Sequence, residues 1–412
     1  MTILLNPIRL FLLGYMLFLS APVSTQVQDV TQDGVSVQIP FQKYGDFILV
    51  QGKLFGTAKL NLIFDTGAEN TIIFERLYTD LFGVEYDRRI PLYGADLSVE
   101  LYALIVRNIE LKVGPAKPKT MSMLVLEEDY STMNQFLGVE IHGILGASYF
   151  SDYVVEINYR SGYIELHKAE KFNYRERKYD TFPISLANNK PYVEANVILA
   201  DSDSLALNFL LDTGAGLALL IHTNTHPSLE LPDKVIRGQL GAGLGGYLRG
   251  YLGRLQAMEL WGYQFQGIVA CYQDLDTFLF DYKQLNRQGI IGNQFLSRFH
   301  LYIDYPRAKV HIRPYRKYNR PFKYDKSGLS IIATGPYLRE YYVINVVEDS
   351  PAFEAGIRKG DRLLTFQRLP AKWFGLGTIN RKLMKREGKK IRMKIERNSQ
   401  AEIFSFQLRE LF

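Results

Sequence analysis

The chain has 412 residues, of which 47% are hydrophobic and 22% charged, a globular composition that excludes a disordered or collagen-like chain and has room for two or three domains. Its single cysteine, Cys271, excludes an intramolecular disulfide and a zinc site built on cysteines. The net charge of +6 is uneven: residues 325–412 hold 17 Lys and Arg against 10 Asp and Glu, so the first 324 residues carry −1, which argues against a protein that coats nucleic acid.

The first 25 residues have the pattern of a secretory signal peptide. Arg9 precedes an apolar run of about ten residues at 10–19, and the small, turn-prone segment 20–25 follows. A membrane span needs roughly 20 apolar residues, so an uncleaved membrane anchor fits this segment less well. We therefore expect an exported protein, periplasmic or extracellular, whose mature chain begins near residue 26.

Three features then recur in the same order at an almost constant offset of 146 or 147 residues. They are Asp-Thr-Gly-Ala at 65–68 and 212–215, Gly-Ile-Leu-Gly at 143–146 with Gly-Ile-Ile-Gly at 289–292, and the apolar segments 153–159 and 299–305. A long repeat of this kind indicates a duplicated structural unit. The sequence therefore predicts two homologous lobes, residues 26–172 and 173–318.

Both halves have the pattern of mainly β lobes. Segments rich in Val, Ile, Tyr, Phe and Leu alternate with glycine-bearing or polar turns, as at 46–51 and 192–199. Helical periodicity is scarce before residue 350. The polar segments 172–179 and 313–321 are the expected connections, the first between the two lobes and the second to the rest of the chain.

The repeated Asp-Thr-Gly is the candidate catalytic motif. One copy alone is weak, because Asp-x-Gly is common in turns. Two copies in duplicated lobes are different, since a pseudo-twofold axis brings equivalent loops together and sets Asp65 against Asp212. Two carboxyl groups so close share one proton at moderate pH and titrate as a pair. One can then activate a water while the other protonates a carbonyl oxygen, an acid–base hydrolysis of amides that requires no metal or cofactor.

These residues resemble the aspartic proteases, and the retropepsin-like branch more closely than the pepsins. The alanine after both Asp-Thr-Gly motifs carries the resemblance, together with the segment 289–296, which is similar to the apolar-apolar-Gly motif and short helix of retroviral proteases. The resemblance implies two β-barrel lobes with a cleft between them, and catalytic roles for Asp65 and Asp212. Both halves lie in one chain, so it also implies that a monomer suffices for catalysis.

The resemblance further implies supporting roles for the residues beside the aspartates. Thr66 and Thr213 would form a hydrogen-bonded grip below the pair, and Gly67 and Gly214 would present backbone groups to the substrate. In pepsins a Ser or Thr usually follows, and its hydroxyl helps to stabilise the ionised pair. Because alanine stands there in both halves, we expect a pH optimum less acidic than that of pepsin.

A hairpin that covers the cleft is expected between the Asp-Thr-Gly and the later glycine motif of each half. The candidates are Tyr93 and Gly94 within 91–97, and Gly243 and Gly245 within 241–247. Dense glycine suits the tip of a mobile flap. Each stretch is equally consistent with an ordinary surface hairpin.

Residues 325–412 have a different pattern, of short strands and two helices. Ser350 is followed by Pro351 and, after four more residues, by Gly356, which are the N-cap, first-turn and C-terminal signals of a helix. Through Ser-Pro-Ala-x-x-Ala-Gly-Ile-x-x-Gly-Asp-x-Leu at 350–363, this segment resembles a PDZ domain, a small α+β module. The resemblance implies a module that binds an extended peptide ligand by adding it to a sheet edge.

By the same resemblance, the peptide groove of the module has a carboxylate-holding loop and a receiving strand. The loop would be Gly335, Pro336, Tyr337 and Leu338, and the receiving strand would be 341–346. The loop departs from the common Gly-Leu-Gly-Phe sequence, which leaves the binding of C-terminal carboxylates open. The basic cluster at 381–390 fits an acidic partner and a solvated helix face equally well.

The sequence thus predicts an exported aspartic endopeptidase that hydrolyses peptide or protein substrates, with a PDZ module for substrate or partner recognition. The alternative is a catalytically inactive peptide-binding or scaffold protein with the same fold. Loss of either aspartate would favour the alternative, and both aspartates are present.

Overall fold

The computed structural model describes residues 29–31, 33–94, 100–128, 132–199, 204–275 and 287–412. The expected signal peptide lies outside these residues. Within them, none of the helices has the length and apolar character needed to span a bilayer.

Among its described residues, the first half has ten strands and three short α-helices. The strands are β1 (Ser36–Tyr44), β2 (Phe47–Leu54), β3 (Ala58–Phe64), β4 (Ile72–Ile73), β5 (Tyr86–Tyr93), β6 (Glu100–Val113), β7 (Lys119–Leu126), β8 (Gly143–Leu145), β9 (Tyr153–Asn158) and β10 (Tyr163–Lys168). The helices are α1 (Leu77–Asp80), α2 (Met133–Leu137) and α3 (Ala147–Phe150).

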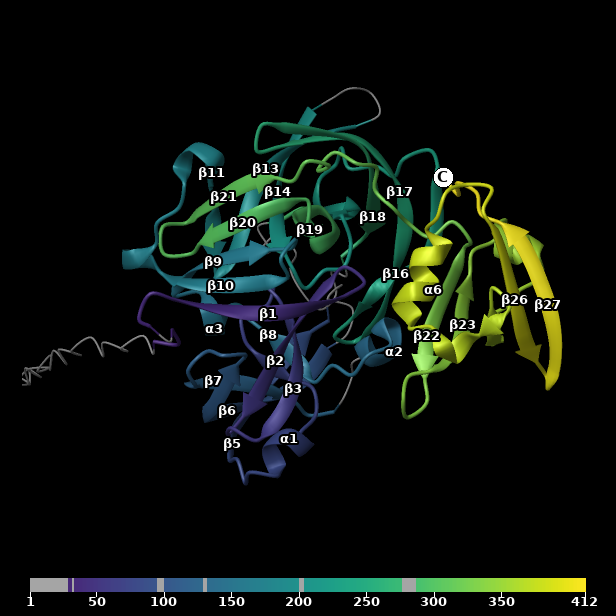
Figure 1. Cartoon of the computed structure of the whole chain (residues 1–412). Helices are drawn as coiled ribbons and strands as arrows, with labels where there is room; N and C mark the ends of the chain where they lie inside the picture. The colour runs from purple at the N-terminus through teal and green to yellow at the C-terminus, as the bar shows by residue number, and fades with distance from the viewer. Residues whose placement is uncertain (1–28, 32, 95–99, 129–131, 200–203, 276–286) are drawn as a thin grey trace, which may run out of the picture.

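The second half has eleven strands and one short helix among its described residues. The strands are β11 (Asp180–Pro183), β12 (Ser185–Ala187), β13 (Lys190–Ile198), β14 (Ser204–Asp212), β15 (Leu219–His222), β16 (Val235–Gly243), β17 (Gly246–Leu260), β18 (Tyr263–Gln273), β19 (Gly289–Gly292), β20 (Phe299–Asp304) and β21 (Lys309–Pro314), and the helix is α4 (Asn293–Leu296). Figure 1 shows the first half at the bottom of the view and the second half above it.

The two halves share one strand topology. In the first, β8 runs parallel to β3 and antiparallel to β4, and β4 runs parallel to β7. In the second, β19 has the same relation to β14 and β15, and β15 to β18. The loops after β3 and β14, which carry the two Asp-Thr-Gly motifs, therefore occupy equivalent places.

A sheet with strands from both halves joins the lobes. At its centre β9 pairs antiparallel with β20, with Val155 opposite Ile303. On either side it continues through β10 and β1 of the first half, and through β21 and β11 of the second. The largest apolar cluster contains buried side chains of both lobes. The mainly β, barrel-like lobes predicted from the sequence are confirmed.

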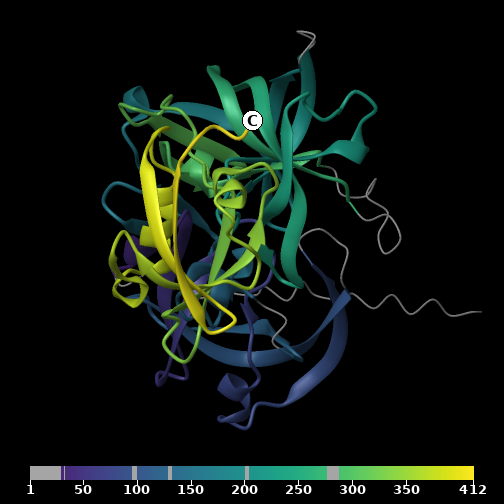
Figure 2. The ribbon, with the colours of Figure 1, turned by 90° about the vertical axis from the view of Figure 1, so that its right-hand side faces the viewer.

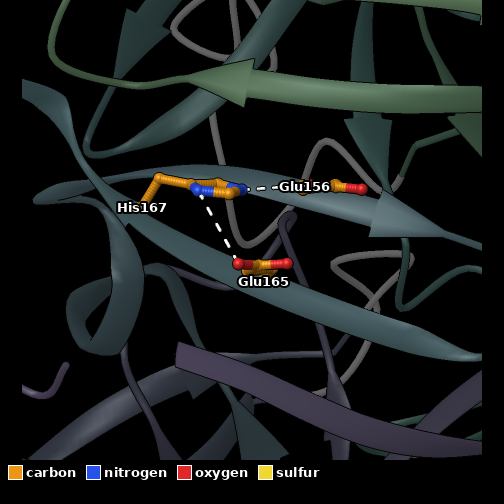
Figure 3. Close-up of side chains that lie close together, drawn as sticks. All are labelled: Glu156, Glu165 and His167. Atoms are coloured by element: carbon orange, nitrogen blue, oxygen red, sulfur yellow. Dashed lines mark hydrogen bonds and ion pairs between the residues drawn. The ribbon is translucent and has the colours of Figure 1, made fainter. Parts of the chain in front are cut away.

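A buried glutamate lies at the centre of this joining sheet. Glu156 accepts hydrogen bonds from Tyr163 Oη at 2.9 Å and contacts His167 Nε2 at 3.1 Å and His300 Nε2 at 2.8 Å. Figure 3 shows Glu156, His167 and Glu165. One carboxylate oxygen of each glutamate and one imidazole nitrogen of His167 lie within 4.8 Å of one another. Burial alone would raise the pKa of Glu156, but the hydrogen bonds from His167, His300 and Tyr163 outweigh it and lower the pKa to about 2. The cluster is therefore a polar network that connects the lobes.

The segment between the second lobe and the last ninety residues packs tightly on the lobe. Phe322 and Tyr324 are buried in the core of the lobes, and the Arg298 guanidinium lies 3.5 Å from the centre of the Phe322 ring. Arg298 Nη1 also donates to the Arg320 carbonyl at 2.6 Å. The end of the predicted connection 313–321 and the residues that follow it therefore pack on the second lobe.

The last ninety residues form a separate six-stranded sheet with its own core. Its elements are β22 (Leu329–Thr334), β23 (Glu340–Val346), α5 (Pro351–Glu354), β24 (Arg362–Phe366), β25 (Leu369–Pro370), α6 (Leu376–Leu383), β26 (Lys390–Arg397) and β27 (Gln400–Gln407). Ser350 caps α5 as predicted, its Oγ accepting from the Phe353 N–H at 3.3 Å. Figures 1 and 2 show this module lying against β16, β17 and α2 of the lobes.

The structure corrects the predicted peptide groove of the module. The expected receiving strand is β23, which pairs with β22 along its length and with β24 at Tyr341 and Tyr342, so it is an interior strand of the sheet. The loop Gly335 to Leu338 is the turn between β22 and β23, closed by the Leu338 N–H donating to the Gly335 carbonyl at 3.0 Å, and Tyr337 is 85% exposed. The sheet ends at β22 and β27, and these strands carry its edges.

The end of the chain fastens the module to the second lobe. Glu410 accepts hydrogen bonds from Arg254 Nη2 of β17 at 2.7 Å and from Tyr324 Oη at 2.6 Å, and it pairs with Lys326. The terminal Phe412 ring packs 4.4 Å from the Tyr324 ring and 5.5 Å from the Arg254 guanidinium. The final residues thus hold β17 and the module together.

Replacing Glu156 by Gln should destabilise the protein by about 1–3 kcal/mol at pH 7, because hydrogen bonds to a buried charged group are lost. The folded-state pKa of Glu156 lies below its ordinary value of 4.5, so this stabilisation is complete above pH 4.5 and fades as the pH falls toward 2. Urea unfolding at pH 7 and pH 3 measures it. The exposed Glu402→Gln is the control, and a wild-type advantage over Glu156→Gln that does not change with pH would contradict the assignment.

Candidate active site

The structure brings the two Asp-Thr-Gly loops face to face. The carboxyl groups of Asp65 and Asp212 hydrogen-bond to one another. The Gly67 N–H donates to Asp65 Oδ1 at 2.7 Å, and the Ala68 N–H donates to the same oxygen at 3.1 Å. The Gly214 N–H donates to Asp212 Oδ1, also at 2.7 Å. Each carboxyl group is thus held by its own loop and directed at its counterpart.

The threonines of the two motifs bind each other's loops. Thr66 Oγ1 donates to the Leu211 carbonyl at 2.7 Å and accepts from the Thr213 N–H at 3.1 Å. Thr213 Oγ1 donates to the Phe64 carbonyl at 2.9 Å and accepts from the Thr66 N–H at 3.1 Å. Both side chains are fully buried. The loops are therefore fixed relative to one another by four reciprocal hydrogen bonds.

The motif glycines are needed because the loops cross at close range. A Cβ on Gly67 would lie 2.6 Å from Asp212 Cγ, and one on Gly214 would overlap Asp65 Cγ. The backbone of each loop therefore touches the carboxyl group of the other lobe, and a side chain at either glycine would push the pair apart.

The two carboxyl groups differ in their electrostatic surroundings. Burial and the charge of Asp212 raise the pKa of Asp65 well above its usual range. Burial also raises the pKa of Asp212, but the hydrogen bond with Asp65 and the Arg287 guanidinium oppose the rise. The pair therefore shares one proton at moderate pH and titrates as a unit, with the Arg287 charge acting on the side of Asp212.

A cavity of about 430 Å³ contains the pair. Its walls are largely apolar and come from both lobes, with Phe47, Phe74 and Leu124 from the first and Leu217 and Ile290 from the second. Apolar walls around a few polar groups are typical of a ligand site.

The predicted flap residues lie at the ends of two hairpins. Tyr93 is the last residue of β5, and Gly94 follows it; both line the cavity, and the rest of that predicted stretch, 95–97, lies outside the described residues. Gly243 ends β16 and lines the cavity, while Gly245, at φ 92°, forms the turn into β17. Both hairpins therefore border the cleft, as flaps would.

Sequence reasoning missed two cations in the cleft. Lys190, at the start of β13, and Arg287, just before β19, line the cavity together with Asp212. Arg287 Nε is buried without a hydrogen-bond partner. Burial, followed by the Arg287 charge, lowers the pKa of Lys190. The signal that could have found Arg287 is its place two residues before the second glycine motif, where the first half has Ile141.

Sequence reasoning also missed a contribution of α2. Met133 and Phe136 of this helix line the same cavity. A helix of five residues leaves a weak periodic signal, and its place in the cleft depends on packing between segments far apart in the chain.

Comparisons with known proteins support the two parts of the chain separately. Residues 50–149 match the family model described as aspartyl protease, and residues 320–408 match that of the PDZ domain. The chain thus carries an aspartyl protease domain and a C-terminal PDZ domain. None of the curated proteins matches it. Among solved structures, the aspartic proteinase from Irpex lacteus aligns with a TM-score of 0.43 at 13% identity, over 69% of this chain and 100% of that chain.

Replacing Arg287 by Met should shift the acidic limb of the kcat/KM profile to higher pH. The guanidinium opposes the rise in the pKa of Asp212, so its removal raises that pKa, and the singly protonated pair then persists only at higher pH. The pH dependence of cleavage of a short peptide measures this. Arg358→Met, which removes an exposed arginine of the module, is the control, and an acidic limb that stays in place would refute the assigned influence on Asp212.

Proposed function

We propose that the protein is an exported aspartic endopeptidase that hydrolyses peptide bonds with a water activated between Asp65 and Asp212. The observation that carries the proposal is the buried carboxyl pair, in which each aspartate is held by its own loop and touched by the glycine of the other loop. The aspartyl protease family match supports it for the first half. Export is proposed from the N-terminal 25 residues of the sequence alone.

In this mechanism the two aspartates have complementary roles. Asp212, ionised, takes a proton from a water that lies between the carboxyl groups, and the water oxygen attacks the carbonyl carbon of the scissile peptide bond. Asp65, protonated, donates its proton to the carbonyl oxygen. Collapse of the tetrahedral intermediate breaks the C–N bond as a proton passes to the leaving nitrogen, and the pair returns to its single-proton state.

The fold supplies the positioning that this chemistry needs. The threonine grip keeps the two loops from drifting, and the joining sheet holds the lobes below them. Rigid placement of acid and base lowers the entropic cost of reaching the transition state. The residues that act on the substrate come from the chain itself, and the proposal requires no metal or cofactor.

We further propose that the PDZ module binds a peptide segment of a substrate or partner. The PDZ family match supports this. In domains of this kind, an extended peptide adds a strand to an exposed sheet edge. In this module the sheet edges belong to β22 and β27.

Asp65→Asn and Asp212→Asn should each lower kcat by at least about 10²–10⁴, the contribution of positioned proton transfer. Asn keeps the shape of Asp, so folding should persist. The double variant should be little worse than either single one, because the pair acts as a unit. Cleavage of a fluorogenic peptide measures the rates, with the exposed Asp87→Asn as control. A variant that retains a tenth of the wild-type rate would rule out the paired mechanism, and absence of cleavage by the wild type would favour the inactive binding protein.

Specific activity should remain constant on dilution, because both halves of the site lie in one chain. An enzyme that assembles its site from two chains loses activity as its concentration falls through the dissociation constant of the dimer. Rates per mole of protein, measured over a thousandfold range of concentration, distinguish these cases. A proportional loss of specific activity would show that a second chain completes the site.

A further inference from the structure

The module has a sheet edge that the lobes cover. β22 pairs with β23 from Leu329 opposite Val346 to Thr334 opposite Glu340, and it is the terminal strand of its sheet. Among the described residues its other edge has no strand partner. Helix α6 lies beside it. An exposed strand edge with a neighbouring helix is where an extended peptide can be added as a further strand.

Helix α2 of the first lobe packs against this strand. Figure 1 shows α2 between the lobes and β22, directly beside the module. The helix ends at Gly138, which has φ 68° and donates its N–H to the Asn134 carbonyl at 2.9 Å. A segment of the protease domain therefore lies where a peptide would approach β22.

Gly138 sits between the edge strand and the helix of the module. A Cβ at this position would lie 2.9 Å from Leu376 Cβ of α6 and 3.4 Å from Ala333 Cβ of β22. Both of these residues are buried. Glycine is thus required twice, for the left-handed backbone and for the close approach of the first lobe to the module.

The other side of α2 belongs to the cleft. Met133 and Phe136 line the cavity that holds the aspartates. Met133 is also buried in an apolar cluster against which the tip of the β16–β17 hairpin packs, through Ala242 and Leu244. One short helix therefore touches the module, the cavity and the hairpin that borders it.

The cleft must widen to admit a protein substrate. A cavity of about 430 Å³ lies in the lower part of the roughly 300–1,000 Å³ range of small-molecule sites. Six residues of extended peptide span about 20 Å. The tip of the β16–β17 hairpin packs on α2 across the cleft. Moving these two elements apart makes room for the substrate.

We propose that docking of α2 on the β22 edge holds the cleft closed, and that an extended peptide added to β22 displaces α2 and opens the cleft. The peptide and α2 compete for one edge, so each excludes the other. A peptide bound at β22 then raises the affinity of the cleft for substrate, and bound substrate raises the affinity of β22 for the peptide by the same factor. The effect on cleavage rests on the proposed function, whereas the docking of α2 does not.

A reversible cross-link tests the docking. In Gly138→Cys with Ala333→Cys, the Cβ atoms would start close to the 3.5–4.5 Å separation of a disulfide, and the chain's own Cys271 is buried. The oxidised protein should cleave a fluorogenic peptide at least about tenfold more slowly in kcat/KM than the same protein after reduction, within the usual range of allosteric coupling. Equal rates in the two states would overturn the proposal.

A second variant shifts the equilibrium the other way without a cross-link. Gly138→Ala places a methyl group against Leu376 and should release α2, which raises kcat/KM several-fold. Gly83→Ala is the matched control, because Gly83 also follows a short helix and has φ 62°, and a Cβ added there would have nothing within 4 Å. Its activity should remain at the wild-type value. A gain in both variants, or in neither, would contradict the proposal.

Hydrogen exchange separates this inference from the catalytic proposal. Amides 133–138 should exchange faster in Gly138→Ala than in wild type, and slower in the oxidised cysteine pair. A pool of random heptapeptides should protect the amides of β22 in the reduced pair and leave them unprotected in the oxidised pair. These results without any peptide cleavage would support the docking and remove the catalytic proposal. Unchanged exchange in 133–138 would remove the docking, whatever the activity.

Discussion

The structure depends on burying two carboxyl groups against each other. A buried carboxylate is costly unless hydrogen bonds and charge sharing compensate, and neither loop supplies enough compensation alone. Asp65 and Asp212 receive backbone N–H groups from their own loops, the threonines fix each loop to the other lobe, and the pair shares one proton. The lobes are therefore coupled through the site itself as well as through the joining sheet.

The sequence alone predicted much of this arrangement, because a motif that recurs in two duplicated lobes must lie at equivalent positions in both. One Asp-Thr-Gly is ordinary turn chemistry, but two copies at one offset place Asp65 and Asp212 on equivalent loops. The helix after Ser350 followed from its capping residues, which are a local signal. The mainly β lobes followed from the alternation of apolar segments and turns, whereas the PDZ module followed from the resemblance of the motif at 350–363 to a known family.

Features that depend on contacts between distant segments were not predicted. Arg287 has no charged counterpart in the first half, so the repeat marks its position before the second glycine motif but not its approach to Asp212. The interior position of β23 depends on strand order, which alternation cannot reveal. Phe322 and Tyr324 stand among polar and basic residues in the sequence, which predicts an exposed segment. Their burial depends on contacts with Arg298 and with the core of the lobes, which lie elsewhere in the chain. The contact between Gly138 and Leu376 spans two domains and leaves no pattern in either.

The fastening of Phe412 and Glu410 to β17 has a consequence for biosynthesis. Arg254 and Glu410 are 156 residues apart in the chain, so β17 leaves the ribosome long before the residues that fasten it to the module. The contacts of Arg254 with Glu410 and Phe412 can therefore form only after the module has been synthesised. A chain truncated before Glu410 lacks these contacts.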